Sequence, residues 1–146
     1  MGNWEYFAGL ARMAAGGLAW AWPVTAVLVL LVVGAAVWSR RELNALFRVR
    51  VLWQLLPLGV PIAVLALGTL YACGNCSPSS LGQGHRHVWA MRASDTLLVA
   101  QLLGAAMLVK LGSPLRALAA SFQLFLVWCS FWAGFMAGMS MSGDWL

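Results

Sequence analysis

The sequence predicts an all-α integral membrane protein, a four-transmembrane-helix bundle with a short interfacial helix at its N-terminus. Four apolar stretches are each close to the ~20 residues that a helix needs to cross about 30 Å of hydrocarbon. They cover residues 18–38, 51–72, 88–109 and 117–138. Of the 146 residues, 62% are hydrophobic and 9% are charged, so a soluble fold would have too few polar side chains for its surface. We therefore expect a single membrane domain over residues 1–146.

The distribution of cations predicts the orientation of these spans. Arg40, Arg41, Arg48 and Arg50 lie between the first two spans, and Lys110 and Arg116 flank the turn between the last two. The positive-inside rule places both connections in the cytoplasm. Both termini then lie outside, in a multi-pass protein of a bacterial inner membrane. Because most cations lie in the two predicted cytoplasmic connections, we interpret the net charge of +5 as a sign of contact with the lipid bilayer. We expect no nucleic-acid partner.

The N-terminal residues and the first two spans carry local signals. Trp4, Phe7 and Leu10 recur at three-residue steps, which is typical of a short helix lying in the interface plane. Pro57 and Pro61 each remove an intrahelical hydrogen bond from the second span, so this helix should be kinked or locally unwound. Broken helices form the ion or substrate sites of many transporters, although no intramembrane carboxylate accompanies these prolines.

Small residues predict close helix packing in the last two spans. Ser130, Gly134 and Gly138 recur every four residues in the fourth span, and Ala100 and Gly104 form a shorter version in the third. Such faces allow two backbones to approach closely. The contact can be within the chain or with a second copy or partner subunit. We expect Leu126 to lie off this face, toward lipid.

The polar residues within the spans are neutral. Thr25, Gln54, Gln101 and Gln123 are expected to form hydrogen bonds between helices, each contributing about 1 kcal/mol. An ion-coupled pump needs ionisable groups at mid-depth, and the spans contain none there. The sequence thus argues against such a pump.

The connection between spans two and three contains a CxxC pair. Cys73 and Cys76 can form a structural disulfide, or one of them can act as a thiolate nucleophile. In span count and in this one motif the chain resembles the four-span thiol oxidoreductases of the DsbB and VKOR families. Those enzymes use a second cysteine pair, whereas Cys129 lies alone in the fourth span, which puts an electron-transfer role in doubt.

The same connection can be interpreted as a metal site. The candidate ligands are Cys73, Cys76, His85 and His87, with Met136, Met139 and Met141 at the end of the fourth span. Four nitrogen and sulfur ligands suit tetrahedral zinc, and thioethers suit Cu(I). The His-x-His spacing is unlike that of common zinc sites, and methionines at a helix end often serve as apolar filling. Copper or zinc is therefore possible but not required.

No nucleotide-binding, hydrolase or metalloprotease motif occurs in the sequence, so the main soluble enzyme classes have no support. We expect a non-enzymatic packing or accessory subunit of a homo-oligomer or larger membrane complex. Two alternatives stay open: a thiol-redox or metal-handling protein that uses the CxxC connection, and a small transporter or channel that uses the kinked second span.

Overall fold

The computed structural model describes residues 3–39, 50–72, 88–111 and 115–142, and these residues form helices with no strand among them. The elements are α1 (Asn3–Trp20), α2 (Trp22–Trp38), α4 (Arg50–Leu55), the 3-10 turn η1 (Leu56–Leu58), α5 (Gly59–Leu70), α6 (Val88–Leu111) and α7 (Arg116–Ser142). The all-α prediction is confirmed. Three helical segments are long and apolar enough to cross a membrane, and a fourth is present if α1 and α2 form one bent span. The structure is thus compatible with the expected four-span bundle.

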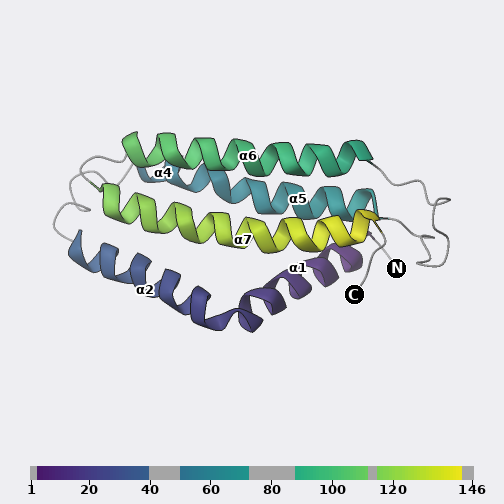
Figure 1. The fold of residues 1–146 in the computed structure, drawn as a ribbon, viewed down its shortest axis with the longest axis horizontal. Coiled ribbons are helices and arrows are strands. Elements are labelled where there is room, and N and C mark those ends of the chain that lie inside the picture. Colours follow the sequence, from purple (N-terminus) through teal and green to yellow (C-terminus); the bar gives the residue numbers. More distant parts are fainter. Residues whose placement is uncertain (1–2, 40–49, 73–87, 112–114, 143–146) are drawn as a thin grey trace.

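The central helix of the bundle is α7 (Figure 1). α5 and α6 pack along α7, while α1 contacts α5 and α7, and α2 contacts α7. At one end of the bundle, α1 and α6 begin and α5 and α7 end (Figure 1); we call it the terminal end. At the other end, α6 ends with Lys110 in its last turn and α7 begins with Arg116; we call it the basic end.

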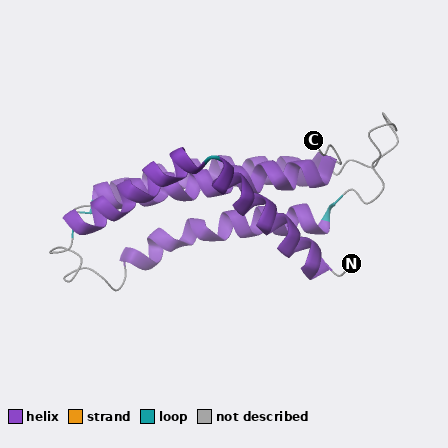
Figure 2. Cartoon of the chain, turned by 90° about the horizontal axis from the view of Figure 1, so that it is seen from below, coloured by secondary structure: helices purple, strands orange, loops and turns teal. Residues whose placement is uncertain are grey.

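The first two helices differ from the sequence prediction. α1 and α2 meet at Ala21 with a bend of 88° (Figure 2). The break lies three residues after the predicted start of the first span at Leu18, because α1 continues to Trp20. The limits of this span stay a prediction. Helix α1 continues this far because Leu10, Ala14 and Gly17 form one buried stripe at helical spacing, and this stripe faces the bundle.

The other spans follow the sequence closely. In the second span the 3-10 turn η1 lies between α4 and α5, and Pro57 is buried in it. A 3-10 turn is wound more tightly than an α-helix, so the predicted kink or local unwinding stays a prediction. Pro61 lies in the first turn of α5, where its missing N–H costs little. α6 and α7 begin at or next to the predicted positions, and both extend further at their C-termini than predicted.

Two apolar clusters hold the helices together toward the terminal end. One contains Leu10, Ala14, Leu65 and Ala133, and the other contains Val64, Ala90, Ala137 and Met141. The backbones of α5 and α7 approach closely beside the second cluster: a Cβ added to Gly68 would lie 2.8 Å from Cα of Ala137. This contact fixes the register of α5 against α7.

Candidate functional site: polar contacts between the helices

The residues of the predicted redox and metal site lie mostly outside the described residues. This applies to Cys73, Cys76, His85 and His87, so both hypotheses stay predictions. The methionines of the predicted copper set are described, and two of them pack among apolar side chains. Met141 is only 1% exposed, and Met136 packs against the cluster around Leu10. Within the described ranges, no three His, Cys, Asp or Glu side chains come together.

At the terminal end, a chain of hydroxyl groups connects three helices. Ser140 of α7 donates from Oγ to the carbonyl oxygen of Gly68 at 2.8 Å, and the Tyr6 hydroxyl of α1 lies 2.8 Å from the same Oγ. Because the single proton of Ser140 is used toward Gly68, Tyr6 must be the donor to Ser140. The carbonyl of Gly68 belongs to the last turn of α5, where no intrahelical N–H reaches it.

At the bend between α1 and α2, the hydroxyl of Thr25 also bonds to backbone carbonyls. Its hydroxyl donates to the carbonyl oxygen of Leu18 at 2.9 Å and shares its proton with that of Ala21 at 3.2 Å. The indole Nε1 of Trp128 donates to the same hydroxyl oxygen at 3.1 Å. The Ala21 carbonyl already accepts the backbone N–H of Thr25 at 3.1 Å, so the hydroxyl of Thr25 chiefly satisfies the carbonyl of Leu18 at the helix break. Trp128 joins the bend to α7.

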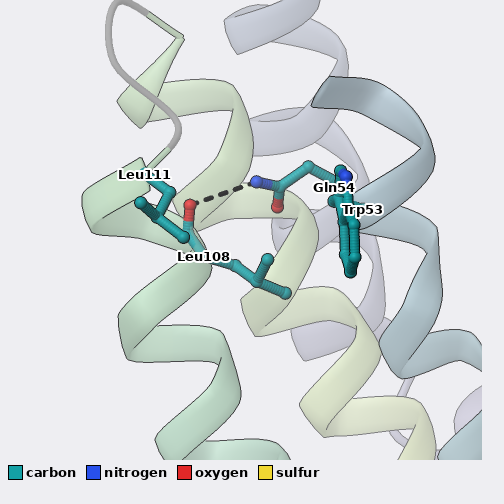
Figure 3. Close-up of a pocket in the computed structure, with 4 residues that line it drawn as sticks. All are labelled: Trp53, Gln54, Leu108 and Leu111. Atoms are coloured by element: carbon teal, nitrogen blue, oxygen red, sulfur yellow. Dashed lines mark hydrogen bonds between the residues drawn. The ribbon is translucent and has the colours of Figure 1, made fainter. Parts of the chain in front are cut away.

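Toward the basic end, two glutamine amides link three helices. Gln54 Nε2 donates to the carbonyl oxygen of Leu108 at 3.1 Å (Figure 3). Gln123 Nε2 donates to Gln54 Oε1 at 2.9 Å and to the Gln54 carbonyl oxygen at 3.2 Å. Leu108 lies in the last turn of α6, where carbonyls lack intrahelical donors. Pro57 lies three residues after Gln54 and has no N–H, so it cannot donate to the Gln54 carbonyl in a 3-10 turn.

In all three places a neutral polar side chain satisfies a carbonyl at a helix end or break. A carbonyl that is removed from water without a hydrogen-bond donor would cost free energy. The predicted structural role of Thr25, Gln54 and Gln123 is thereby confirmed. The sequence analysis missed Tyr6, Ser140 and Trp128. Ser140 continues the small-residue spacing of Ala133 and Ala137, which is a signal that could have identified it as buried.

Among the described residues, five buried side-chain atoms have no hydrogen-bond partner: Ser94 Oγ, Gln101 Nε2, Gln123 Oε1, Ser130 Oγ and Trp132 Nε1. Two of them lie at mid-depth on facing helices. Gln101 is 4% exposed and Ser130 is fully buried, and neither Gln101 Nε2 nor Ser130 Oγ has a hydrogen-bond partner. Both residues lie near the middle of their helices. The contact of Gly134 with Leu98, where an added Cβ would lie 2.9 Å from Leu98 Cδ1, places Gln101 at about the depth of Ser130. The bend at Ala21 lies at a similar depth, since Thr25 contacts Trp128.

The small-residue faces predicted for helix packing have different surroundings. On α7, Ser130 and Gly134 face other helices of the same chain, because Ser130 is fully buried and Gly134 contacts Leu98. Gly138 has no neighbouring atom within 4 Å of an added Cβ. On α6, Gly104 likewise has no such neighbour, and Ala100 is exposed. Of the two predicted faces, the one on α6 is therefore open to a partner.

The expectation for Leu126 is wrong. Its side chain is only 4% exposed and does not face lipid. Leu126 precedes Ser130 by four residues and Ala133 by seven, so all three lie on one side of the helix. The bulky residues around α7 concealed this stripe in the sequence.

Comparison of the chain with protein-family models, curated proteins and solved structures gives no match. The geometry of the described helices therefore carries the functional argument. Its main components are the internal polar contacts, the unpartnered polar atoms at mid-depth and the open face of α6.

Proposed function

We propose that the protein is a non-enzymatic packing or accessory subunit of a membrane assembly, and that it binds a second copy or another membrane subunit through α6. The main support for this proposal is the open small-residue face formed by Ala100 and Gly104, which has room for a neighbouring backbone. Helices in lipid associate chiefly through close van der Waals contact, and small residues permit it. The internal use of the polar side chains of Thr25, Gln54 and Gln123 supports a structural role.

The experiment fills this face with a large side chain. Gly104→Leu should reduce the size of the complex in mild detergent, measured by native mass spectrometry, while thermal stability stays at the wild-type level. The matched control is Gly34→Leu on α2, because Gly34 also has no neighbour within 4 Å of an added Cβ but has Leu30 and Trp38 one turn away on either side. Unchanged complexes in both variants, or a wild type that is monomeric and purifies alone, would contradict the proposal.

We further propose that the membrane is a bacterial inner membrane and that the terminal end faces outside. Lys110 and Arg116 at the basic end support this orientation under the positive-inside rule. Single-cysteine variants at Gln83 and Asn44, on a cysteine-free background, test it with a membrane-impermeant thiol reagent. Labelling from outside is expected at position 83 and protection at 44, and the reverse pattern would invert the orientation.

A second candidate function is a permeation path for a small neutral solute. It is favoured by the shared depth of the α1–α2 bend and the unpartnered atoms of Gln101 and Ser130, with the η1 break nearby in the second span. Discontinuous helices and polar groups at mid-depth are features of transporter sites. Liposomes containing the protein should then take up glycerol faster than empty liposomes, and Gln101→Leu should slow the uptake. Uptake equal to that of empty liposomes would exclude glycerol permeation and remove this candidate's support.

A further inference from the structure

A groove at the basic end lies between α4 and α6 (Figure 3). Its volume is about 400 Å³, and Trp53, Gln54, Leu108 and Leu111 line it. The amide nitrogen of Gln54 is engaged with Leu108, so the groove offers mainly apolar surface. Trp53 is 60% exposed and Leu111 is 71% exposed. An apolar groove on a helix bundle in a membrane fits a hydrocarbon chain.

The start of α7, at the same end of the bundle, favours an anion. Ala119 N–H donates to the carbonyl of Leu115 at 2.9 Å, so Leu115 holds the N-cap position and its side chain has no acceptor for the first-turn N–H groups. These groups and the helix dipole attract negative charge. Arg116 is exposed in this turn, and Lys110 is exposed in the last turn of α6.

The charges elsewhere in the described helices do not oppose an anion here. The acidic residues of those helices are Glu5, in the first turn of α1, and Asp95, in the half of α6 nearer the terminal end. Both lie away from the basic end. Among the described residues the basic end therefore has positive charge, an uncapped helix start and a groove for an acyl chain.

We propose that this end binds one anionic phospholipid, with an acyl chain in the groove and the headgroup phosphate near Arg116 and Lys110. Basic residues near a membrane surface each contribute about 1 kcal/mol of attraction to anionic lipids, which corresponds to roughly a fivefold preference per cation at 25 °C. A zwitterionic lipid can occupy the same groove but gains no such preference. The site is separate from the proposed packing function, although Gly104 lies one helical turn from Leu108.

The experiment uses Trp53 as the reporter. The full-length protein is placed in phosphatidylcholine vesicles that contain either brominated phosphatidylglycerol or, at the same mole fraction, brominated phosphatidylcholine. Bromine on the acyl chain quenches nearby tryptophan, and subtraction of the Trp53→Phe spectrum isolates the Trp53 signal. Brominated phosphatidylglycerol should quench this signal at a several-fold lower mole fraction than brominated phosphatidylcholine.

The double variant Lys110→Gln/Arg116→Gln should reduce this difference several-fold, with helical content and complex size unchanged. Arg92→Gln is the matched control, because Arg92 is exposed on α6 far from the basic end, and it should retain the difference. Equal quenching by the two lipids in the wild type, no quenching of Trp53 by either, or a preference of undiminished size in the double variant would each overturn the proposal. A change in complex size after Gly104→Leu tests only the packing function.

Discussion

The two halves of the bundle are held together by different interactions. Toward the terminal end, α1 packs on α5 and α7, and both apolar clusters lie in this half. Toward the basic end, α2 packs on α7 without a single buried residue. Here the amides of Gln54 and Gln123 join α4, α6 and α7, and an open groove remains between α4 and α6.

The comparison shows where small residues join helices by close van der Waals contact and where polar side chains join them by hydrogen bonds. Apolar contact between helices in lipid is favourable only where the surfaces approach closely. The terminal half achieves this with Gly17, which lies against the ring of Trp132, and Gly68, which lies against Ala137. In the basic half, the described glycines Gly34, Gly59 and Gly104 have no neighbour within 4 Å of an added Cβ. Its helices are connected by hydrogen bonds to open carbonyls, a contact that the terminal half also has between Ser140 and Gly68.

The largest effect should come from widening the close contact in the terminal half. Gly68→Ala would place a Cβ 2.7 Å from Cβ of Ala137 and 2.8 Å from its Cα, so α5 and α7 must separate. We expect a loss of about 3 kcal/mol, in the upper part of the range for overpacking. The measurement is the temperature at which half of the helical circular-dichroism signal is lost in detergent.

The control for this change is Gly59→Ala in the same span. A Cβ at Gly59 has no neighbour within 4 Å, and alanine is the better helix former by about 1 kcal/mol. This variant should be as stable as the wild type or slightly more so. Equal losses in the two variants would show that the close approach of Gly68 to Ala137 does not stabilise the terminal half.

The next effect concerns Leu126, near the middle of α7, where the two halves meet. Leu126→Ala should cost about 2 kcal/mol, at the low end for a buried leucine, because a cavity would form among neighbouring helices. Leu124→Ala is the matched control: Leu124 is 55% exposed, and lipid tails can fill the space it leaves. The two variants are compared in the same thermal unfolding assay. If both lose the same stability, Leu126 does not pack inside the bundle.

Much of the fold could be predicted because hydropathy and proline are local signals. The starts of α6 and α7 needed no knowledge of tertiary contacts, and Pro57 marked the place where the α-helix gives way to a 3-10 turn. The extent of α1 could not be predicted in this way. It depends on contacts between its buried stripe and distant residues, such as that of Gly17 with Trp132, whereas Pro23 and the apolar run after Leu18 indicated only where a span could begin.

The sequence predicted that Gln54 and Gln123 form hydrogen bonds between helices, but not which groups they bond to. Gln54 and Gln123 were expected to bond between helices, and they do so with each other. Which residues meet depends on helix register, and the contact of Gly68 with Ala137 has the same offset of 69 residues as this glutamine pair. A single sequence contains no signal for that offset. The carbonyl of Leu108 accepts a hydrogen bond from Gln54 because α6 ends at Leu111, so that no intrahelical N–H reaches this carbonyl.

A smaller effect is expected from the hydrogen bonds of the basic half. Gln123→Leu would remove the donor to both oxygens of Gln54 and leave them unsatisfied in an apolar setting. It would also remove Gln123 Oε1, which is buried without a partner, and this gain offsets part of the loss. We expect a loss of about 1 kcal/mol, since hydrogen bonds between membrane helices average less than this and two are removed. Tyr6→Phe at the terminal end removes one such bond and should cost less. If Tyr6→Phe costs more than Gln123→Leu, the two halves do not differ in the way proposed.

The smallest effect, and one of opposite sign, is expected at mid-depth. Gln101 Nε2 is buried without a partner, and a buried donor without a partner costs free energy that an apolar side chain of similar size does not. In a packing subunit, Gln101→Leu should therefore keep or raise thermal stability, by up to about 1 kcal/mol. The control is Gln123→Leu, where the same substitution removes bonds that are present. A clear loss of stability in Gln101→Leu would mean that this amide binds a group at mid-depth, and it would favour the permeation path over the packing role.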